Sequence, residues 1–239
     1  MKKLPLFFLL LIVASCKKEI DPNINNGSKI ETELPQVKVL KTDTIAISGY
    51  DTKTNYIIAS LLKKTVTKEG NENVQYRLAF YTNNKQIASK DLTINDCFKD
   101  SEWSANYGLS PDDDSSVSPF IQLDYGVQTD GSLQKQYLFY LADKKLQLVH
   151  EWESSSDSGV GSWTVFLNAN PKNEKQTFYS RSVSFDYKDD NNDTIGIATY
   201  SDTIKIYFEN DQWKKQLLTP KGKIYRKKEV SIDNFDFKK

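Results

Sequence analysis

Apolar and polar residues alternate over several parts of this chain. In residues 76–80 and 204–208, aromatic and aliphatic side chains occupy every second position. Successive side chains of a strand point to opposite faces of a sheet, so this period of two predicts strands with one buried face. From residue 37 onward, no stretch of twelve residues has the period of an amphipathic helix. The pattern predicts a single all-β domain over residues 37–239.

Turn-forming residues separate the apolar segments. Asn, Asp, Gly and Pro occur at 83–84, 130–131, 143–144, 168–171, 189–193 and 210–211. Strands of about five to nine residues joined by such short turns pair with their neighbours in antiparallel fashion. We therefore expect an antiparallel meander.

One hairpin pattern occurs three times along the chain. An aromatic pair precedes a polar turn and a further strand, and another strand lies ahead of each hairpin, at residues 56–62, 120–127 and 194–200. The aromatic pairs are Phe80-Tyr81, Phe139-Tyr140 and Tyr207-Phe208. Such units resemble β-propeller blades, although three units are fewer than the usual four to eight blades. A large β-sandwich would contain the same hairpins, so the sequence leaves both architectures open.

The first fifteen residues have the order of a secretory signal peptide. Lys2 and Lys3 precede an apolar run at residues 4–13, and the small residues Ala14 and Ser15 follow. The apolar run is too short to cross a bilayer, which takes about 20 apolar residues. We expect residues 1–15 to be removed.

The four residues Val13, Ala14, Ser15 and Cys16 resemble the lipobox of bacterial lipoproteins. The resemblance implies that the Cys16 thiol is joined to a diacylglycerol and that a peptidase cuts before this residue. Two acyl chains anchor stably, because each buried methylene contributes about 0.8 kcal/mol and one chain holds only marginally. Residue 17 is Lys, not the Asp that retains some lipoproteins in the inner membrane. The resemblance therefore points to the outer membrane, without indicating which face.

Residues 16–36 contain few side chains that could build a core, and Asn, Ser, Thr and Glu are prominent. As a random coil, about twenty such residues span about 25 Å. We expect a flexible tether between the lipidated Cys16 and the β domain.

The charge balance argues against a nucleic-acid partner. The chain has 32 basic and 32 acidic residues, and removal of residues 1–15 takes away two lysines. The mature chain is thus slightly acidic, whereas proteins that bind phosphate backbones carry a basic excess. The densest basic stretch, residues 221–228, is interpreted as a solvated strand edge, where Lys discourages aggregation.

Two reactive side-chain types are interpreted as structural. With Cys16 lipidated, Cys97 is the one cysteine left, which excludes an intramolecular disulfide and favours a buried thiol. His150 is the only histidine and continues the alternation of residues 146–152, so we expect it to be partly buried. A zinc site built on several histidines is impossible, and no Gly-x-Ser-x-Gly turn is present.

One loop is a candidate metal site. Asp189, Asn191 and Asp193 offer oxygen ligands at alternate positions, and the loop resembles the Asp-x-Asn-x-Asp turns of some calcium-binding propeller repeats. An EF-hand would need Gly and Glu where this chain has Thr194 and Tyr200. A plain solvated turn would use the same residues. Calcium is the one cofactor that the sequence suggests.

Aromatic and acidic side chains supply the remaining candidates. Trp103 and Trp163 lie in Ser- and Gly-rich surroundings, and we expect them to be the exposed tryptophans that could contact a ligand. Glycoside cleavage requires two carboxylates about 5–9.5 Å apart. Several acidic residues lie on or beside expected strands, but the sequence singles out no pair among Asp124, Glu151, Glu153 and Asp186.

These features together predict an envelope lipoprotein that is held on the membrane by its lipid. Its β domain is expected to be a non-catalytic binding or scaffold module with a protein or glycan partner. An envelope glycan hydrolase is the alternative.

Overall fold

The computed structural model describes residues 38–48, 53–109, 118–127, 131–157, 160–168, 176–189 and 192–231, all within the compact unit Val37–Lys239. The predicted signal peptide, Cys16 and the tether lie outside the described residues. Within the described part there is no helix, and hence none long and apolar enough to cross a bilayer.

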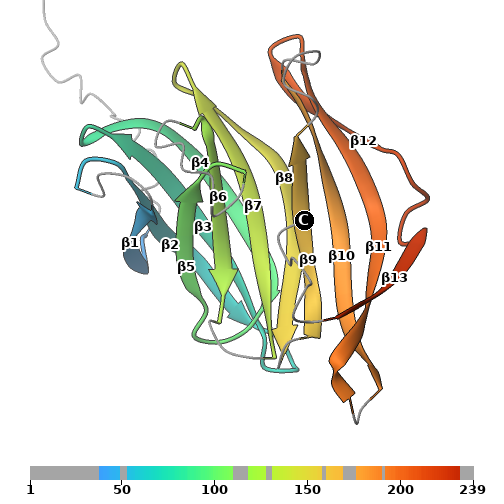
Figure 1. Cartoon of the computed structure of the whole chain (residues 1–239). Helices are drawn as coiled ribbons and strands as arrows, with labels where there is room; N and C mark the ends of the chain where they lie inside the picture. Colours follow the sequence, from blue (N-terminus) through green and yellow to red (C-terminus); the bar gives the residue numbers. More distant parts are fainter. Residues whose placement is uncertain are drawn as a thin grey trace, which may run out of the picture. The chain divides into compact units, whose positions relative to one another are not determined.

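The described residues form thirteen strands, which confirms the prediction of an all-β domain (Figure 1). The strands are β1 (Lys41–Ser48), β2 (Tyr56–Val66), β3 (Glu72–Thr82), β4 (Lys85–Cys97), β5 (Glu102–Tyr107), β6 (Phe120–Gly126), β7 (Ser132–Ala142), β8 (Lys145–Asp157), β9 (Val160–Asn168), β10 (Thr177–Asp189), β11 (Asn192–Glu209), β12 (Gln212–Leu217) and β13 (Arg226–Ser231).

All thirteen strands belong to one hydrogen-bonded sheet. Its order is β12-β11-β10-β9-β8-β7-β6-β5-β1-β2-β3-β4, and β13 pairs with β11 beside β12. Every pairing is antiparallel except that of β1 with β5, where Ile47 faces Ala105 in parallel register. The antiparallel meander is therefore confirmed. The propeller alternative is wrong, because propeller blades are separate small sheets around a common axis.

The three predicted hairpins are present as β3–β4, β7–β8 and β11–β12. Their central residues all have positive φ, between 50° and 63°, as type I′ turns require; they are Asn83-Asn84, Asp143-Lys144 and Asn210-Asp211. The third unit differs from the prediction, because residues 194–200 and 204–208 belong to one strand, β11. A bulge at Asp202, whose φ is 42°, interrupts the alternation there without reversing the chain. The strand ahead of the third hairpin is β10.

The three hairpin turns lie at the same end of the sheet. From β5 to β11 each strand is antiparallel to the next, so β7 and β11 run in the direction of β5. β1 is parallel to β5, and β3, two antiparallel pairings from β1, runs in this direction too. All three turns lie in the upper part of Figure 1. We call this the hairpin end of the sheet.

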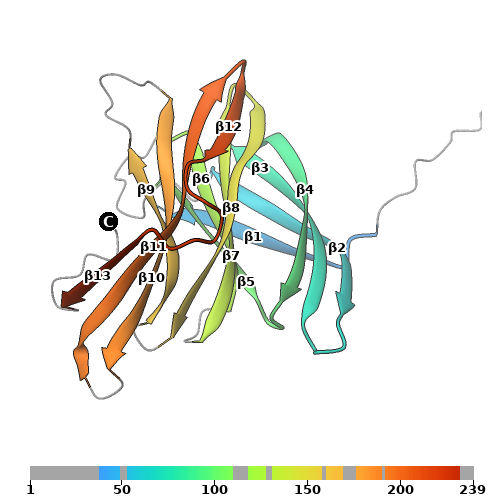
Figure 2. The same ribbon diagram turned by 90° about the vertical axis from the view of Figure 1, so that its right-hand side faces the viewer.

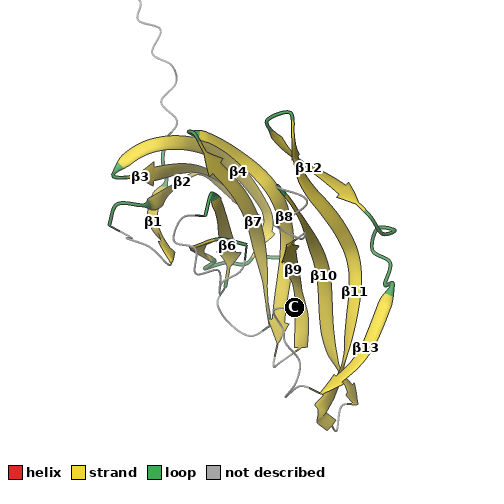
Figure 3. Cartoon of the chain, turned by 45° about the horizontal axis from the view of Figure 1, so that its top comes forward, coloured by secondary structure: helices red, strands yellow, loops and turns green. Residues whose placement is uncertain are grey.

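The sheet curls so that strands far apart in its order approach each other. β4 approaches β7 and β8, and β12 approaches β8; Figures 2 and 3 show the twist and curvature of these long strands. On β7, the consecutive residues Leu138 and Phe139 are both fully buried, so this strand is covered on both faces. Phe139 belongs to a mainly aliphatic cluster built from β1–β7, and Leu138 to an aromatic cluster built from β7, β8, β10, β11 and β12.

A bulge on β8 corrects the predicted alternation of residues 146–152. Phe139 pairs with Leu148 and Leu138 pairs with His150, so Val149 is the extra residue. As a result, Leu148 packs against the aliphatic cluster while Val149 and Trp152 contribute to the aromatic cluster. One extra residue thus exchanges the faces of all the side chains that follow it.

Candidate functional site

The hairpin end carries two pockets, one on each side of the central β7–β8 turn. The first pocket, of about 560 Å³, lies between the β7–β8 and β11–β12 hairpins. The second pocket, of about 250 Å³, lies between the β3–β4 and β7–β8 hairpins. Both are lined by Ala142 and Asp143, so they adjoin at the central turn.

The first pocket combines aromatic walls with polar edges. Tyr140 and Phe208, whose ring centroids are 6.0 Å apart, supply the apolar surface. Side-chain amides and charges are contributed by Asp143, Lys145, Gln176, Asp211 and Gln212. Lys145 and Asp211 are 4.0 Å apart, but both are largely exposed, so their attraction is weak.

Gln147 holds the wall of the first pocket in place. Its Nε2 donates to the carbonyl of Trp213 and its Oε1 accepts from the amide of Trp213, each at 2.8 Å. This pair of bonds joins β8 to β12, which are not neighbours in the sheet. Trp213 in turn packs on Tyr140 at 5.4 Å and on Phe208 at 5.4 Å. These bonds and ring contacts join β8, β12 and the two aromatic walls of the pocket.

The second pocket contains a buried amide. Asn55 is 6% exposed, and its Oδ1 has no hydrogen-bond partner among the described residues. Tyr107 and Leu141 line the same pocket. An unpaired buried carbonyl costs free energy, so the Oδ1 of Asn55 would gain from accepting a hydrogen bond from a ligand in this pocket.

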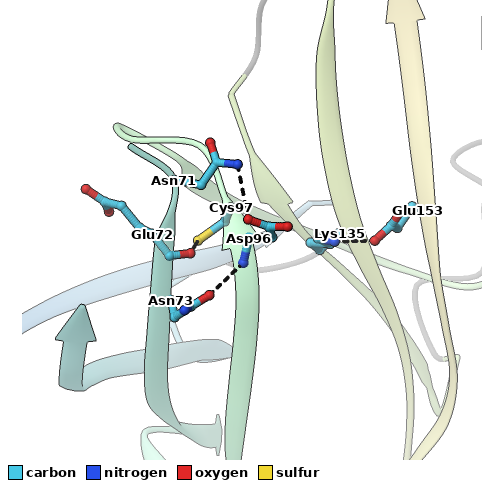
Figure 4. A network of polar contacts seen from close by, with 7 residues as sticks. All are labelled: Asn71, Glu72, Asn73, Asp96, Cys97, Lys135 and Glu153. Atoms are coloured by element: carbon cyan, nitrogen blue, oxygen red, sulfur yellow. Dashed lines mark hydrogen bonds and ion pairs between the residues drawn. The ribbon is translucent and has the colours of Figure 1, made fainter. Parts of the chain in front are cut away.

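A third pocket, of about 320 Å³, lies where β4 approaches β7 and β8. Glu151 and Glu153 line it together with Lys135 and Tyr137, their register partners on β7. Lys135 forms an ion pair with Glu153 (Figure 4). Burial, followed by the nearby Glu151, raises the pKa of Tyr137 far above its ordinary value, so this phenol stays neutral.

Cys97 is buried, as predicted. It is 4% exposed, and its thiol donates to the carbonyl of Glu72 at 3.0 Å (Figure 4). Burial raises the pKa of this thiol, which keeps it in the unreactive protonated form. Glu72 is itself paired with Lys64 at 2.6 Å.

His150 is buried too, in agreement with the sequence-based expectation. It is 7% exposed, stacks on Trp152 at 5.4 Å and lies 3.4 Å from the hydroxyl of Ser180, measured from Nε2. Burial, assisted by the positive charge of Lys215, lowers the pKa of His150 to about 4. The ring is therefore neutral at physiological pH and belongs to the aromatic packing.

The two tryptophans chosen from the sequence lie apart. Trp103 packs edge-on to Tyr76 at 5.2 Å beside the aliphatic cluster, whereas Trp163 packs against a third cluster around Val183 and Phe185. Both are partly buried, so the expectation of two exposed rings is wrong. Large rings on a strand fill the space between neighbouring strands, which the sequence surroundings did not reveal.

The calcium candidate falls partly outside the described residues, since Asn191 and the side chain of Asp193 are not described. Asp189 is exposed and faces Asn192 across the β10–β11 turn. Among the residues that the structure describes, no group of three or more His, Cys, Asp or Glu side chains could hold a metal ion.

The other candidate carboxylates have different surroundings. Asp124 accepts a hydrogen bond from Ser104 at 3.2 Å, and burial raises its pKa. It lines none of the three pockets above, and Asp186 is exposed on β10.

Sequence reasoning missed the hairpin-end pockets, although the threefold repeat of the turns was a signal for them.

Comparisons of the chain with protein-family models, with curated proteins and with solved structures found no match.

Proposed function

We propose that the protein is a lipid-anchored component of the bacterial cell envelope, in the outer membrane, whose β domain binds a glycan at the hairpin end. The observation that carries the binding function is the first pocket, whose walls are joined by Gln147 and Trp213. Ligand pockets are commonly preformed, and their few polar groups fix the orientation of the ligand.

The chemistry of the first pocket favours a hydroxyl-rich ligand. The Tyr140 and Phe208 rings offer faces for the C–H surface of a sugar, while Gln176, Gln212 and Asp143 offer donors and acceptors for hydroxyl groups. Acidic and basic side chains are both present, so the pocket does not select a strongly charged ligand.

A glycan array probed with the mature chain tests this proposal, followed by calorimetry on the glycans that bind. Asp211→Ala combined with Gln212→Ala removes two polar side chains of the pocket, and we expect binding at least about tenfold weaker, since each lost bond contributes about 1 kcal/mol. Asn84→Ala combined with Lys85→Ala, at the equivalent positions of the β3–β4 turn, is the matched control. Equal affinities of the pocket variant and the wild type would refute the assignment of the pocket.

The anchor has a separate test. Its support is the lipobox resemblance at residues 13–16. Radiolabelled palmitate should enter the wild-type protein in a bacterial host and should not enter Cys16→Ala. Equal labelling of the two proteins would contradict lipidation at Cys16, whatever the domain binds.

One observation supports glycan hydrolysis as the second candidate. Glu151 and Glu153 are two residues apart on β8 and line the third pocket. Residues two apart on a strand point to the same face, so both carboxylates face this pocket, and glycosidases use such a pair of carboxylates. If the protein is a hydrolase, it should release reducing ends from envelope glycans, and Glu151→Gln should abolish this release while Lys90→Gln retains it.

A further inference from the structure

The C-terminal edge of the sheet carries a concentration of positive charge. Residues 212–228 contain seven Lys and Arg residues and no acidic residue, although the mature chain as a whole is slightly acidic. Lys214 is paired with Glu209. The lysines at 221, 223, 227 and 228 are exposed, and none of them is paired with an acidic side chain among the described residues.

The same segment exposes large apolar side chains. Leu217, Leu218, Ile224 and Tyr225 are 41%, 49%, 52% and 45% exposed. Single exposed apolar residues are ordinary on protein surfaces, but a group of them within one short connection marks an interaction site. We call residues 217–225, which end β12 and connect it to β13, the basic loop.

Hydrogen bonds to the β11 bulge hold the basic loop in position. The amide of Leu218 donates to the carbonyl of Thr203 at 2.8 Å, and the amide of Gly222 donates to Oδ1 of Asp202 at 2.6 Å. The Tyr225 hydroxyl lies 2.9 Å from Oγ1 of Thr203. These backbone and hydroxyl contacts order the loop, while the side chains of Leu217, Leu218 and Ile224 stay exposed.

The basic loop lies at an edge of the sheet. β12 and β13 pair with successive parts of β11, and no described strand pairs with their outer sides. In Figure 1 this edge is at the right, beyond β11. The basic loop follows the last residue of β12, whereas Asp211 and Gln212, which line the first pocket, lie at the other end of this strand.

We propose that the basic loop docks on the surface of an anionic phospholipid bilayer. Lys221, Lys223 and the basic residues that begin β13 would contact lipid phosphates, and Leu218 and Ile224 would enter the boundary between headgroups and acyl chains. Membrane-surface elements combine these two features, because apolar burial and attraction to anionic lipids add to each other. A nucleic acid would use the cations but leave the apolar side chains in water. This contact extends the proposed anchoring and does not require the lipid on Cys16.

Vesicle sedimentation with the unlipidated mature chain, Cys16→Ser, tests the proposal. Vesicles contain phosphatidylcholine alone or with 30% phosphatidylglycerol, at low and high salt. We expect binding to the anionic vesicles at least about tenfold tighter than to the neutral ones, and weakened by salt. Lys221→Glu with Lys223→Glu should lower the affinity by at least about tenfold, since each charge near an anionic surface contributes about fivefold.

Two matched controls separate docking from general effects. Lys63→Glu with Lys90→Glu makes the same charge change at exposed positions of β2 and β4 and should bind as wild type. Leu218→Ser with Ile224→Ser should weaken binding severalfold, whereas Val66→Ser, at a 63% exposed residue, should not. Wild-type affinity in both loop variants, or no preference for anionic vesicles, would overturn the proposal. Because the assay uses an unlipidated chain and includes no glycan, these outcomes do not depend on the proposed anchor or on the glycan site.

Discussion

The two faces of β7 pack against clusters of different composition. On one face, Phe139 joins a cluster dominated by aliphatic residues, among them the fully buried Ile57 and Leu78. On the other face, Leu138 joins a cluster that contains Phe178 and Trp213. The partly buried members of this cluster are mainly aromatic. A single strand therefore separates two kinds of core.

The difference between the clusters explains where the first pocket lies. Aliphatic side chains can fill the space inside a curled sheet, and the aliphatic cluster has many fully buried members. The aromatic cluster contains rigid rings, and its members Tyr140 and Phe208 also line the first pocket. The buried His150 stacks on its member Trp152 and lies beside the buried Ser180. We infer that the aliphatic cluster provides most of the stability and that the aromatic cluster shapes the binding site.

The largest expected effect comes from Phe80→Ala. Phe80 is 1% exposed and packs edge-on to Phe139 at 5.4 Å, so its removal leaves a cavity in the centre of the aliphatic cluster. We expect the free energy of unfolding to fall by about 4 kcal/mol, measured by urea denaturation. Phe208→Ala, at a partly buried ring beside the pocket, should cost about 2 kcal/mol and should weaken glycan binding as well. A larger loss of stability for Phe208→Ala than for Phe80→Ala would show that the aromatic cluster contributes more to stability than the aliphatic cluster.

The local features of both regions could be predicted from the sequence. The turns at Asn83-Asn84, Asp143-Lys144 and Asn210-Asp211 were predicted because Asn and Asp tolerate positive φ and because alternating residues flank them. Burial of Cys97 was expected from its residue type, and burial of His150 from its place in the alternation of residues 146–152.

The features that required long-range contacts could not be predicted. Asp is a residue type that is common in turns, but Asp202 forms a bulge within β11, because residues on both sides of it pair with β10. The parallel pairing of β1 with β5 joins segments about 60 residues apart, and no local pattern reports it. The first pocket depends on the approach of β12 to β8, so its residues have no common signature in the sequence.

The second prediction concerns pH and the aromatic cluster. The pKa of His150 is lowered to about 4 in the folded protein, from an ordinary value of about 6.5 in the unfolded chain. Between these values the unfolded chain binds the proton first, so acidification favours unfolding. We expect His150 alone to lower the free energy of unfolding by about 3 kcal/mol between pH 7 and pH 4, measured by urea denaturation at several pH values.

The control for this prediction is His150→Gln, which keeps a hydrogen-bonding group near Ser180 but does not titrate. Its loss of stability between pH 7 and pH 4 should be smaller than that of wild type by about the same 3 kcal/mol. Asp124, whose pKa is raised in the folded state, acts in the opposite direction and is common to both proteins. In the aliphatic cluster, burial raises the pKa of Cys97 and Tyr125, which stay neutral over this range. Equal pH dependence in the two proteins would show that His150 is not the responsible group.

The third prediction tests the bond between β8 and β12. Gln147→Ala removes both hydrogen bonds to the backbone of Trp213 and leaves the two peptide groups without these partners. We expect a loss of about 2 kcal/mol in the free energy of unfolding, together with weaker glycan binding because the pocket wall is no longer fixed. Gln86→Ala is the comparison, since Gln86 forms only a 3.4 Å contact to the exposed Tyr81 hydroxyl near the β3–β4 turn. A similar loss in both variants would mean that the pocket wall is held by the aromatic rings alone.

The smallest effect should come from the hairpin turns themselves. Lys144 has a φ of 63°, a left-handed conformation that a long side chain adopts at some cost, whereas Asn84 at the equivalent position of the first hairpin has a φ of 58° and tolerates it better. Lys144→Gly should therefore stabilise the protein by about 0.5–1 kcal/mol, and Asn84→Gly by less, as measured by thermal unfolding. Equal gains would mean that the two turns are strained to the same degree. A greater gain for Lys144→Gly would show that the central turn, which adjoins both hairpin-end pockets, keeps a residue that is unfavourable for folding.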